Sequence, residues 1–331
     1  MTTPDEEFTS TPSSQITEGN PLIVGITAPS FGGKTYSALE LATGMAKVTG
    51  WKIALVDTEA GRGRHYKDLF AYEYVPFKPP FSPMRYMKAI DYCLKHDFKI
   101  IIIDQMTYEH SGDGGVLDQI EDYLQAKAGD DFRKRESYKW AAQIAPKAQR
   151  KALNQYIEQV GTDAMFILCY LANDITKPVK DPLTKKTEAV HVGWTAETTS
   201  KLPTKMTIRF LLPPASDGKP NLNPDTEFEK LSIKMPEMFR GWFKPGLQLN
   251  RALGEKLARW SLGSKVPEAT TVELAWPEQV TEMRAEMKRL GWDKARALAW
   301  LATWNVTQVA SIPREHAADA LGQLIKMEVE S

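Results

Sequence analysis

The chain has 331 residues, of which 42% are hydrophobic and 25% charged, and its formal net charge is zero. This composition is typical of a soluble globular protein with one large and one smaller domain, and it excludes a chain that is disordered throughout. The balanced charge points to no class of partner. No stretch approaches the roughly 18 consecutive apolar residues of a membrane span, so no membrane partner is expected.

The N-terminal stretch and the two cysteines indicate a cytoplasmic location. Residues 1–20 contain acidic residues but neither Lys nor Arg, which is unlike a secretory signal. Cys93 and Cys169 both lie in apolar periodic stretches. We therefore expect them to be reduced residues of the core.

In chain order, residues 1–20 come first, and their Thr, Ser, Pro and acidic residues predict a disordered tail. Beyond them, apolar runs alternate with stretches whose apolar residues have helical spacing. Buried strands are expected at residues 21–27, 52–59, 99–104, 164–174 and 205–214. Helices are expected at residues 34–50, 83–96, 116–127, 141–161 and 247–262, with a bend near Pro146 in the fourth.

This alternation predicts an α/β fold, in which helices flank both faces of a mainly parallel sheet. We expect the core to span residues 21–262 and a linker rich in Gly, Ser, Pro and Thr to span residues 263–275. Residues 276–331 predict a small helical domain with at least three short amphipathic helices. Its tryptophans have helical spacing, which favours a hydrophobic core over an array for base stacking: Trp276, Trp292, Trp300 and Trp304.

A phosphate-binding loop is predicted where the first strand ends. The pattern GxxxxGK(S/T) presents backbone N–H groups and a helix N-terminus to phosphates. Ala28 takes the place of the first glycine, which is tolerable if its φ is negative, and Gly33 lets the backbone approach the phosphates. Lys34 would reach the β- and γ-phosphates and Thr35 would ligate Mg²⁺. The alternative is a glycine-rich turn without a ligand. The residues expected to bind ATP are Ala28, Pro29, Ser30, Phe31, Gly32, Gly33, Lys34, Thr35 and Tyr36.

Acidic residues follow two further predicted strands. Because ligands bind at the carboxyl ends of parallel strands, these residues are expected to lie near Lys34. Asp104 is expected to hold Mg²⁺ together with Thr35, and the alternative is a cap of the following turn. Glu59, two residues after Asp57, is expected to be the general base that orients water, and the alternative is a solvated loop acid. The expected catalytic residues are thus Lys34, Glu59 and Asp104.

The order of these motifs resembles the RecA-like core. A phosphate loop precedes a strand that ends in DTEAGR and then a strand that ends in IIIDQMTYEHSGDGG. More narrowly, residues 21–262 resemble the RecA-like P-loop ATPases of bacteriophages that are associated with single-strand annealing and homologous recombination. By this resemblance Lys34 and Thr35 match the phosphate-loop pair, Glu59 the catalytic glutamate and Asp104 the second acidic motif.

The resemblance implies that two loops bind single-stranded DNA, here residues 105–115 and 174–205. Lysines of the second loop would neutralise phosphates and its tryptophan would stack on a base, and the alternative is a solvated loop that binds nothing. The residues expected to contact DNA are Lys177, Lys180, Lys185, Lys186 and Trp194. A second basic stretch, residues 132–151, is either a further DNA surface or a charged helix face.

The resemblance also implies a homo-oligomer, a filament or ring, with the ATP site between subunits. Lys234 is then expected to be a trans finger that reaches the neighbour's γ-phosphate, and the alternative is a surface lysine. The family often has a basic or amide residue after the fourth strand, where it senses the γ-phosphate. Here Leu171 is near that place and Asn173 is the nearest amide.

Together these features predict a Mg²⁺- and ATP-dependent RecA-like ATPase that acts on single-stranded DNA, with other phage recombination proteins, in the host cytoplasm. The first alternative is an ATP-gated assembly or partner-loading protein with weak hydrolysis, which Leu171 favours. A small-molecule P-loop kinase is a further alternative, which is disfavoured because the sequence has no recognisable arginine-rich lid.

Overall fold

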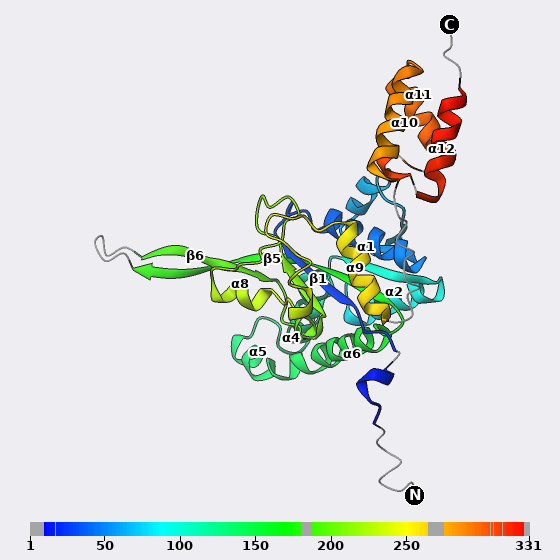
Figure 1. Ribbon diagram of the computed structural model, residues 1–331. Helices are drawn as coiled ribbons and strands as arrows, with labels where there is room; N and C mark the ends of the chain where they lie inside the picture. Colours follow the sequence, from blue (N-terminus) through cyan, green and yellow to red (C-terminus); the bar gives the residue numbers. More distant parts are fainter. Residues whose placement is uncertain are drawn as a thin grey trace, which may run out of the picture. The chain divides into compact units, whose positions relative to one another are not determined.

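The computed structural model describes residues 10–16, 18–180, 187–263, 275–304, 306, 308–312 and 314–327. The chain divides into two compact units, Met1–Val266 and Pro267–Ser331 (Figure 1). The first unit contains the sheet, and the second is helical. Among the described residues, no helix is both long and apolar enough to cross a membrane.

The first unit is built on a sheet of seven strands in the described part of the chain, in the order β3-β2-β4-β5-β1-β7, with β6 paired to β5. All pairings along this order are parallel, and β6 is antiparallel to β5. The strands are β1 (Ile23–Ala28), β2 (Lys52–Asp57), β3 (Glu73–Pro76), β4 (Phe98–Asp104), β5 (Met165–Lys180), β6 (Thr187–Ala196) and β7 (Ile208–Leu211). The predicted α/β class is therefore confirmed.

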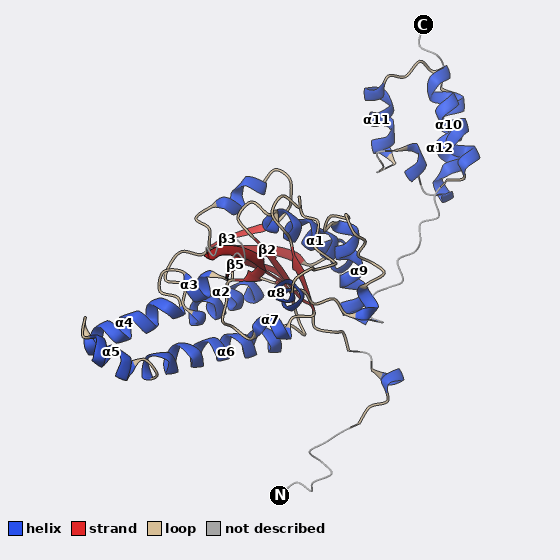
Figure 2. Ribbon diagram, turned by 90° about the vertical axis from the view of Figure 1, so that its left-hand side faces the viewer, coloured by secondary structure: helices blue, strands red, loops and turns tan. Residues whose placement is uncertain are grey.

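The strands read as continuous apolar runs because both faces of the sheet are covered (Figure 2). In β4, Ile100 and Ile102 belong to the core on one face, whereas Ile101 and Ile103 belong to the core on the other. The first face is covered by α1 (Lys34–Thr49) and α9 (Arg251–Leu262), and the second by α2 (Pro83–Lys95) and α6 (Ile144–Val160). Strand β3 was not expected from the sequence because its four residues are at most half-buried and include a proline.

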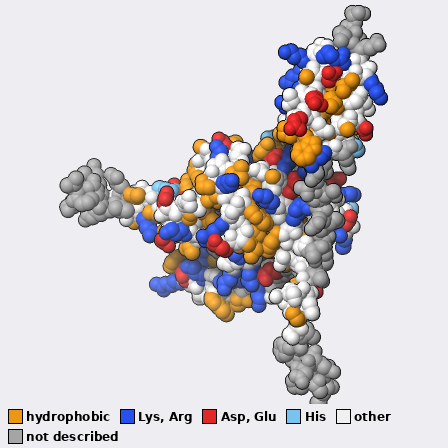
Figure 3. All heavy atoms as spheres, viewed as in Figure 1, with side chains coloured by type: hydrophobic (Ala, Val, Ile, Leu, Met, Phe, Trp, Pro, Cys, Tyr) orange, Lys and Arg blue, Asp and Glu red, His pale blue; other side chains and the backbone are white. Residues whose placement is uncertain are grey.

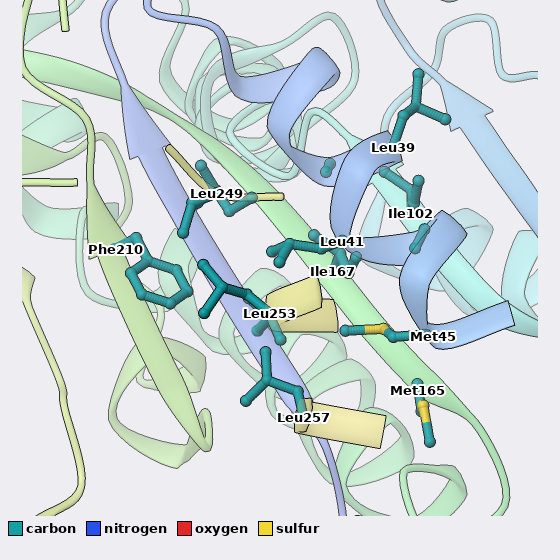
Figure 4. Close-up of a cluster of buried hydrophobic side chains, with 14 of the residues drawn as sticks. Leu39, Leu41, Met45, Ile102, Met165, Ile167, Phe210, Leu249, Leu253 and Leu257 are labelled. Carbon is teal, nitrogen blue, oxygen red and sulfur yellow. The ribbon is translucent and has the colours of Figure 1, made fainter. Parts of the chain in front are cut away.

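Helices α1 and α9 approach each other closely at two glycines. A Cβ atom on Gly44 would lie 1.9 Å from the carbonyl oxygen of Arg251, and one on Gly254 would lie 2.0 Å from that of Leu41. Around this contact, Leu41 and Met45 of α1 pack with Leu253 of α9 (Figure 4). The close approach fixes α1, and thereby the loop at its N-terminus, against the sheet.

Beyond β4 the chain forms α3 (Tyr108–Ser111), α4 (Val116–Ala128) and α5 (Phe132–Tyr138) before α6. The predicted helix of residues 141–161 is divided into a 3₁₀ turn, Ala141–Gln143, and α6. Pro146 lies in the first turn of α6, where backbone N–H groups have no partner within the helix, so it marks a helix start and not a bend. The remaining helices of this unit are α7 (Leu202–Lys205) and α8 (Glu227–Ser232), with short 3₁₀ turns at Ser13–Gln15, Arg62–Tyr66 and Glu237–Phe239.

The predicted tail and linker fall partly outside the described residues, namely residues 1–9 and 17 of the tail and 264–274 of the linker. The described end of the tail is bound to α9, because the backbone N–H of Asn20 donates to the carbonyl oxygen of Ser261 at 2.6 Å. The Ser261 hydroxyl returns a hydrogen bond to the carbonyl oxygen of Asn20, also at 2.6 Å. The tail is thus ordered where it enters β1.

The second unit contains α10 (Pro277–Arg289), α11 (Lys294–Thr303) and α12 (Arg314–Lys326), with a 3₁₀ turn at Val309–Ser311. Trp300 is buried in its core, and Trp292 and Trp304 pack against that core. Trp276 differs from the expectation, since it is 51% exposed and lies under the guanidinium of Arg314. Three of the four tryptophans therefore serve packing.

A buried ion pair joins α3 to α6. Arg150 Nε lies 2.9 Å from Oε1 and 3.1 Å from Oε2 of Glu109, and both side chains are almost fully buried. The guanidinium also donates to the Thr199 hydroxyl at 2.5 Å and contacts His110 Nδ1 at 3.0 Å. Burial raises the pKa of Glu109, and Arg150 opposes that rise.

Replacing Arg150 with alanine is expected to lower the free energy of unfolding by about 3–5 kcal/mol, because it leaves the Glu109 carboxylate buried without its partner. Denaturant unfolding monitored by circular dichroism measures the change. The control is Arg135→Ala, which breaks an ion pair with the exposed Glu121 and is expected to change stability very little. Equal losses in the two variants would contradict the prediction.

Candidate nucleotide site

The predicted phosphate loop connects β1 to α1. Ala28 is the last residue of β1 and pairs in register with Leu171, and among the described residues it is not one with positive φ. An alanine therefore fits where the pattern has glycine. Gly33 caps α1 with a φ of 82°, a conformation that favours glycine. Phe31 also has positive φ, at 62°, and its side chain is 99% exposed.

Lys34 begins α1 and folds back over the loop. Its Nζ donates to the carbonyl oxygens of Ala28 and Pro29, each at 3.1 Å, and the residue is only 8% exposed. A buried ammonium group needs acceptors, and these two carbonyls supply them. The amine is thus held at the loop, beside the N-terminus of α1, where an anion is also favoured by the helix dipole.

Thr35 and Asp104 bring two distant parts of the sequence into contact. The Thr35 hydroxyl donates to Asp104 Oδ2 at 2.6 Å across a separation of 69 residues. Burial raises the pKa of Asp104 to about 6, the hydrogen bond from Thr35 opposes the rise, and the charge of Glu59 adds to it. The other carboxylate oxygen, Oδ1, is buried without a hydrogen-bond partner among the described residues.

These two side chains fit a Mg²⁺ ion. The unpaired buried carboxylate oxygen of Asp104 and the Thr35 hydroxyl are two oxygen ligands, the type that Mg²⁺ prefers. Such ions commonly use one or two protein oxygens together with substrate phosphates. No cluster of three or more His, Cys, Asp or Glu suited to a metal occurs in the described part of the chain. The donor set therefore suits a metal that arrives with a nucleotide better than a metal held by protein alone.

Metal-dependent nucleotide binding is expected to weaken at low pH because a ligand must be deprotonated and the pKa of Asp104 lies at about 6 instead of 3.8. At pH 7.5 we expect wild-type protein to bind a Mg²⁺–ATP analogue about 10- to 100-fold more tightly than Asp104→Asn, which keeps an acceptor for Thr35. The ratio of the two affinities should shrink towards one at pH 5. Since phosphates also titrate near pH 6, the ratio is the readout and not either affinity alone. Titration calorimetry measures it, and a ratio that does not change with pH would count against the role of Asp104.

The acids after β2 have separate roles. Asp57 organises the chain: its carboxylate accepts hydrogen bonds from the backbone of Glu59 at 2.7 Å and of Gly63 at 3.1 Å, and from the Tyr74 hydroxyl at 2.9 Å. The Glu59 side chain is largely buried beside Gln105, whose Nε2 donates to Glu59 Oε1 at 2.7 Å. Asp57 thus shapes the loop and Glu59 remains the acid at the site.

A cavity of about 180 Å³ joins the phosphate loop to Glu59. Six of the nine residues predicted for ATP binding line it: Ser30, Phe31, Gly32, Gly33, Lys34 and Thr35. Arg62, His65 and Tyr66 complete the lining, and the sequence reasoning missed them. They lie three to seven residues after Glu59, in the short 3₁₀ turn Arg62–Tyr66. Their closeness to Glu59 in the sequence was the signal that could have identified them. Tyr36 instead packs edge to face against Phe70, with 5.3 Å between ring centroids.

The expected place of a γ-phosphate sensor has no polar side chain. Leu171 pairs with Ala28 at the end of the parallel sheet, and its backbone N–H donates to the Thr107 hydroxyl at 2.8 Å. Asn173 lies two residues further along β5, is exposed and pairs with Thr195 of β6. Among the described residues, no hydrogen bond joins the side chain of Leu171 or Asn173 to the predicted loop.

The prediction of a long loop at residues 174–205 is wrong, because β5 continues to Lys180 and forms an antiparallel hairpin with β6 (Figure 1). The end of β5 mixes β-branched residues with Lys177, Pro178 and Lys180, and these three residues obscured the strand pattern. Lys177 is exposed, with its Nζ 5.1 Å from the ring centroid of Phe228 in α8. Trp194 is half-buried, and its carbonyl oxygen accepts from the Ser232 hydroxyl at 3.1 Å. Lys185, Lys186 and the side chain of Lys180 lie outside the described residues.

The other loop predicted to bind DNA, residues 105–115, is largely buried in the structure, and its binding of DNA stays a prediction. Gln105, Thr107 and Glu109 are each at most 2% exposed, and α3 occupies the middle of the stretch. In the basic stretch 132–151, no residue of α5 is buried, whereas Arg150 of α6 is buried in its ion pair with Glu109. On the face of the core seen in Figure 3, Lys and Arg side chains are interspersed with acidic and hydrophobic ones.

Lys234, the expected trans finger, is bound within its own chain. Its Nζ donates to the carbonyl oxygen of Met206 at 2.6 Å and lies 3.4 Å from that of Thr204. Its backbone forms a bridge with Arg209. Burial and the charge of Arg209 lower the pKa of its amine. A role at a neighbour's site would require this amine to leave its carbonyl partners.

Comparison with known proteins adds little to this picture. No protein-family model matches the chain, and no curated protein matches it. Among solved structures, the KaiC-like protein PH0186 from the hyperthermophilic archaeon Pyrococcus horikoshii OT3 is similar at 14% identity and a TM-score of 0.28, over 52% of this chain and 78% of that one. A likeness of this size carries no argument, so the fold rests on the strand order and the site on its own geometry.

Proposed function

We propose that this chain binds Mg²⁺–ATP and hydrolyses it at the edge of the sheet where β1, β2 and β4 end. The hydrogen bond between Thr35 and Asp104 carries the proposal, because it joins the phosphate-loop motif to the acidic motif of another strand. In the parallel pairing of β2 with β4, Asp57 and Asp104 are register partners, which brings Glu59 to the same edge. Lys34 and Glu59 then line one cavity.

Each of these residues has a distinct task in the proposed reaction. Backbone N–H groups at the start of α1 and the Lys34 amine bind the phosphates. Thr35 and Asp104 would hold Mg²⁺, which neutralises charge that develops on the phosphate oxygens. Glu59 orients a water molecule and accepts its proton as the water attacks the γ-phosphorus.

The direct experiment is phosphate release by the purified full chain. Wild-type protein is expected to release phosphate from ATP with Mg²⁺ and to stop when EDTA removes the metal. A protein that binds Mg²⁺–ATP but shows no turnover, with or without single-stranded DNA, would contradict the hydrolysis and leave the binding. A protein that binds no nucleotide would contradict the whole proposal.

We further propose that single-stranded DNA binds at the β5–β6 hairpin, as in a RecA-like phage recombination protein. The hairpin continues directly from β5, the strand beside the phosphate-loop strand. Its exposed Lys177 and the half-buried Trp194 are the residue types that bind phosphates and bases. A strand shared with the site offers a direct physical link between ATP and DNA.

Removing the hairpin lysines is expected to weaken DNA binding and to flatten its salt dependence. In the variant that replaces Lys177, Lys180, Lys185 and Lys186 with glutamine, each lost phosphate contact should reduce the slope of log affinity against log salt by roughly 0.7. Fluorescence anisotropy with a labelled oligonucleotide at several salt concentrations measures the slope. The matched control instead replaces four basic residues of the stretch 132–151: Arg133, Lys134, Lys139 and Lys147. If the control lowers the slope and the hairpin variant does not, DNA binds at the basic stretch.

The apolar Leu171 at the sensor place favours one alternative, an ATP-gated assembly or partner-loading protein with weak hydrolysis. In that case ATP should change the oligomeric state while turnover stays slow, and DNA should not stimulate it. Sedimentation velocity with ADP and with an ATP analogue, beside turnover measurements, separates the two functions. A filament or ring that forms only with the ATP analogue would also support the proposed homo-oligomer.

A further inference from the structure

Gln105 is anchored at the junction of β2 and β4. It follows Asp104 directly and is only 2% exposed. Its backbone N–H donates to the Thr58 hydroxyl at 2.6 Å, and its carbonyl oxygen accepts from the Tyr86 hydroxyl at 3.0 Å. The Thr58 backbone N–H donates to the carbonyl oxygen of Asp104 at 2.8 Å. The backbone of Gln105 is therefore fixed relative to the residue that precedes Glu59.

The side chain of Gln105 then reaches Glu59 itself. Its Nε2 donates to Glu59 Oε1 at 2.7 Å, and since a carboxylate only accepts hydrogen bonds, the amide nitrogen must be the atom that faces it. The Arg62 guanidinium lies 3.4 Å from the same oxygen, but its side chain is 60% exposed. An ion pair that exposed restrains a side chain weakly. Gln105 is thus the buried donor that fixes the carboxylate.

The other end of this amide is unsatisfied. Gln105 Oε1 is buried without a hydrogen-bond partner among the described residues, although the Tyr108 side chain also faces the amide. Burial of an unpaired carbonyl oxygen is unfavourable. A methionine of similar length would fill the same space without that cost. The contact with Glu59 at 2.7 Å, together with the interaction with Tyr108, distinguishes the amide from such an apolar side chain.

We infer that Gln105 is a positioning residue that holds the Glu59 carboxylate for the attack of water on the γ-phosphate. The inference rests on the proposed ATP hydrolysis. In that step the water oxygen bonds to the γ-phosphorus, the bond to the β–γ bridging oxygen breaks with its electron pair on ADP, and Glu59 accepts the proton. Gln105 keeps its protons throughout. A neutral amide suits this role because it orients the carboxylate without adding a positive charge that would make it a weaker base.

The test compares Gln105→Met with wild-type protein in two measurements. The turnover number for Mg²⁺–ATP is expected to fall about 10- to 100-fold, as for other residues that orient a reacting group without contacting the substrate. The affinity for Mg²⁺ with a non-hydrolysable ATP analogue should stay within about twofold. Gln105→Asn, whose amide is one methylene shorter, is expected to lose turnover in the same way. Thermal unfolding of each variant shows whether it is folded.

Gln149→Met is the matched control, because within the described part of the chain Gln149 of α6 also has a buried amide oxygen with no hydrogen-bond partner, and no hydrogen bond joins it to Glu59. It is expected to keep wild-type turnover. If Gln105→Met turns over like wild type while Lys34→Ala is inactive, the inference is wrong and the proposed function stands. A parallel loss of turnover and analogue affinity in Gln105→Met, or an equal loss in Gln149→Met, would assign Gln105 a structural role only. A wild-type protein without hydrolysis would overturn both proposals.

Discussion

Replacement of Lys34 by alanine is expected to lower the rate of ATP hydrolysis on the order of 10²- to 10³-fold or more. The Lys34 amine is the cation at the phosphate loop, and it is held by two loop carbonyls, of Ala28 and Pro29. Without it, the charge that develops on the γ-phosphate loses a fixed positive partner. Binding of the nucleotide should weaken as well, because the amine also contacts the ground-state phosphates in this proposal. Phosphate release at saturating Mg²⁺–ATP measures the first effect, and titration with an ATP analogue measures the second.

The matched control for this variant is Lys47→Ala at the other end of α1. The Lys47 side chain is exposed and pairs with Glu255 at 2.9 Å on the surface. Both variants remove one lysine from the same helix, so a general effect of charge or helix stability would appear in both. Wild-type hydrolysis by Lys34→Ala would show that the site assignment is wrong, whatever the control does.

The sheet could be predicted from the sequence because its strands are buried on both faces. A run such as the four isoleucines of residues 100–103 packs alternately into two cores, so it is apolar at every position. The phosphate loop was equally visible, since its short pattern stands between such a strand and a helix. Local patterns of this kind contain most of the information that determines the local structure.

The hairpin and the surroundings of Glu59 depend on pairings between distant residues, which no local pattern encodes. Lys177 pairs with Val190 of β6, and the stretch around it is typical of a loop until β6 is placed beside it. Gln105 meets Glu59 across 46 residues, only because β2 and β4 are neighbours in the sheet. The short strand β3 has no apolar run in the sequence, because its exposed and half-buried residues do not have to be apolar.

Replacement of Glu59 by glutamine is expected to separate binding from hydrolysis. The new amide has the same size and retains an oxygen that can accept a hydrogen bond from Gln105 Nε2. In the wild-type structure this nitrogen lies 2.7 Å from Glu59 Oε1. It cannot accept the proton of the attacking water, since a neutral amide is a very weak base. Loss of a general base of this kind reduces turnover about 10²- to 10⁴-fold. Affinity for a Mg²⁺–ATP analogue should remain close to that of wild-type protein, because Lys34 still binds the phosphates and Thr35 and Asp104 would still hold Mg²⁺.

Single-turnover hydrolysis, with enzyme in excess over ATP, isolates this chemical step from product release. Glu73→Gln is the control. Glu73 is an exposed acid at the start of β3 that does not line the cavity, and its replacement removes the same charge as Glu59→Gln does. If Glu59→Gln hydrolyses bound ATP at the wild-type rate, Glu59 is a solvated loop acid and the base lies elsewhere. If it loses ATP affinity together with turnover, Glu59 shapes the nucleotide pocket and its assignment as the general base is wrong. Loss of turnover with intact affinity is the result that the buried contact between Glu59 and Gln105 leads us to expect, since that contact orients the carboxylate and does not touch the phosphate loop.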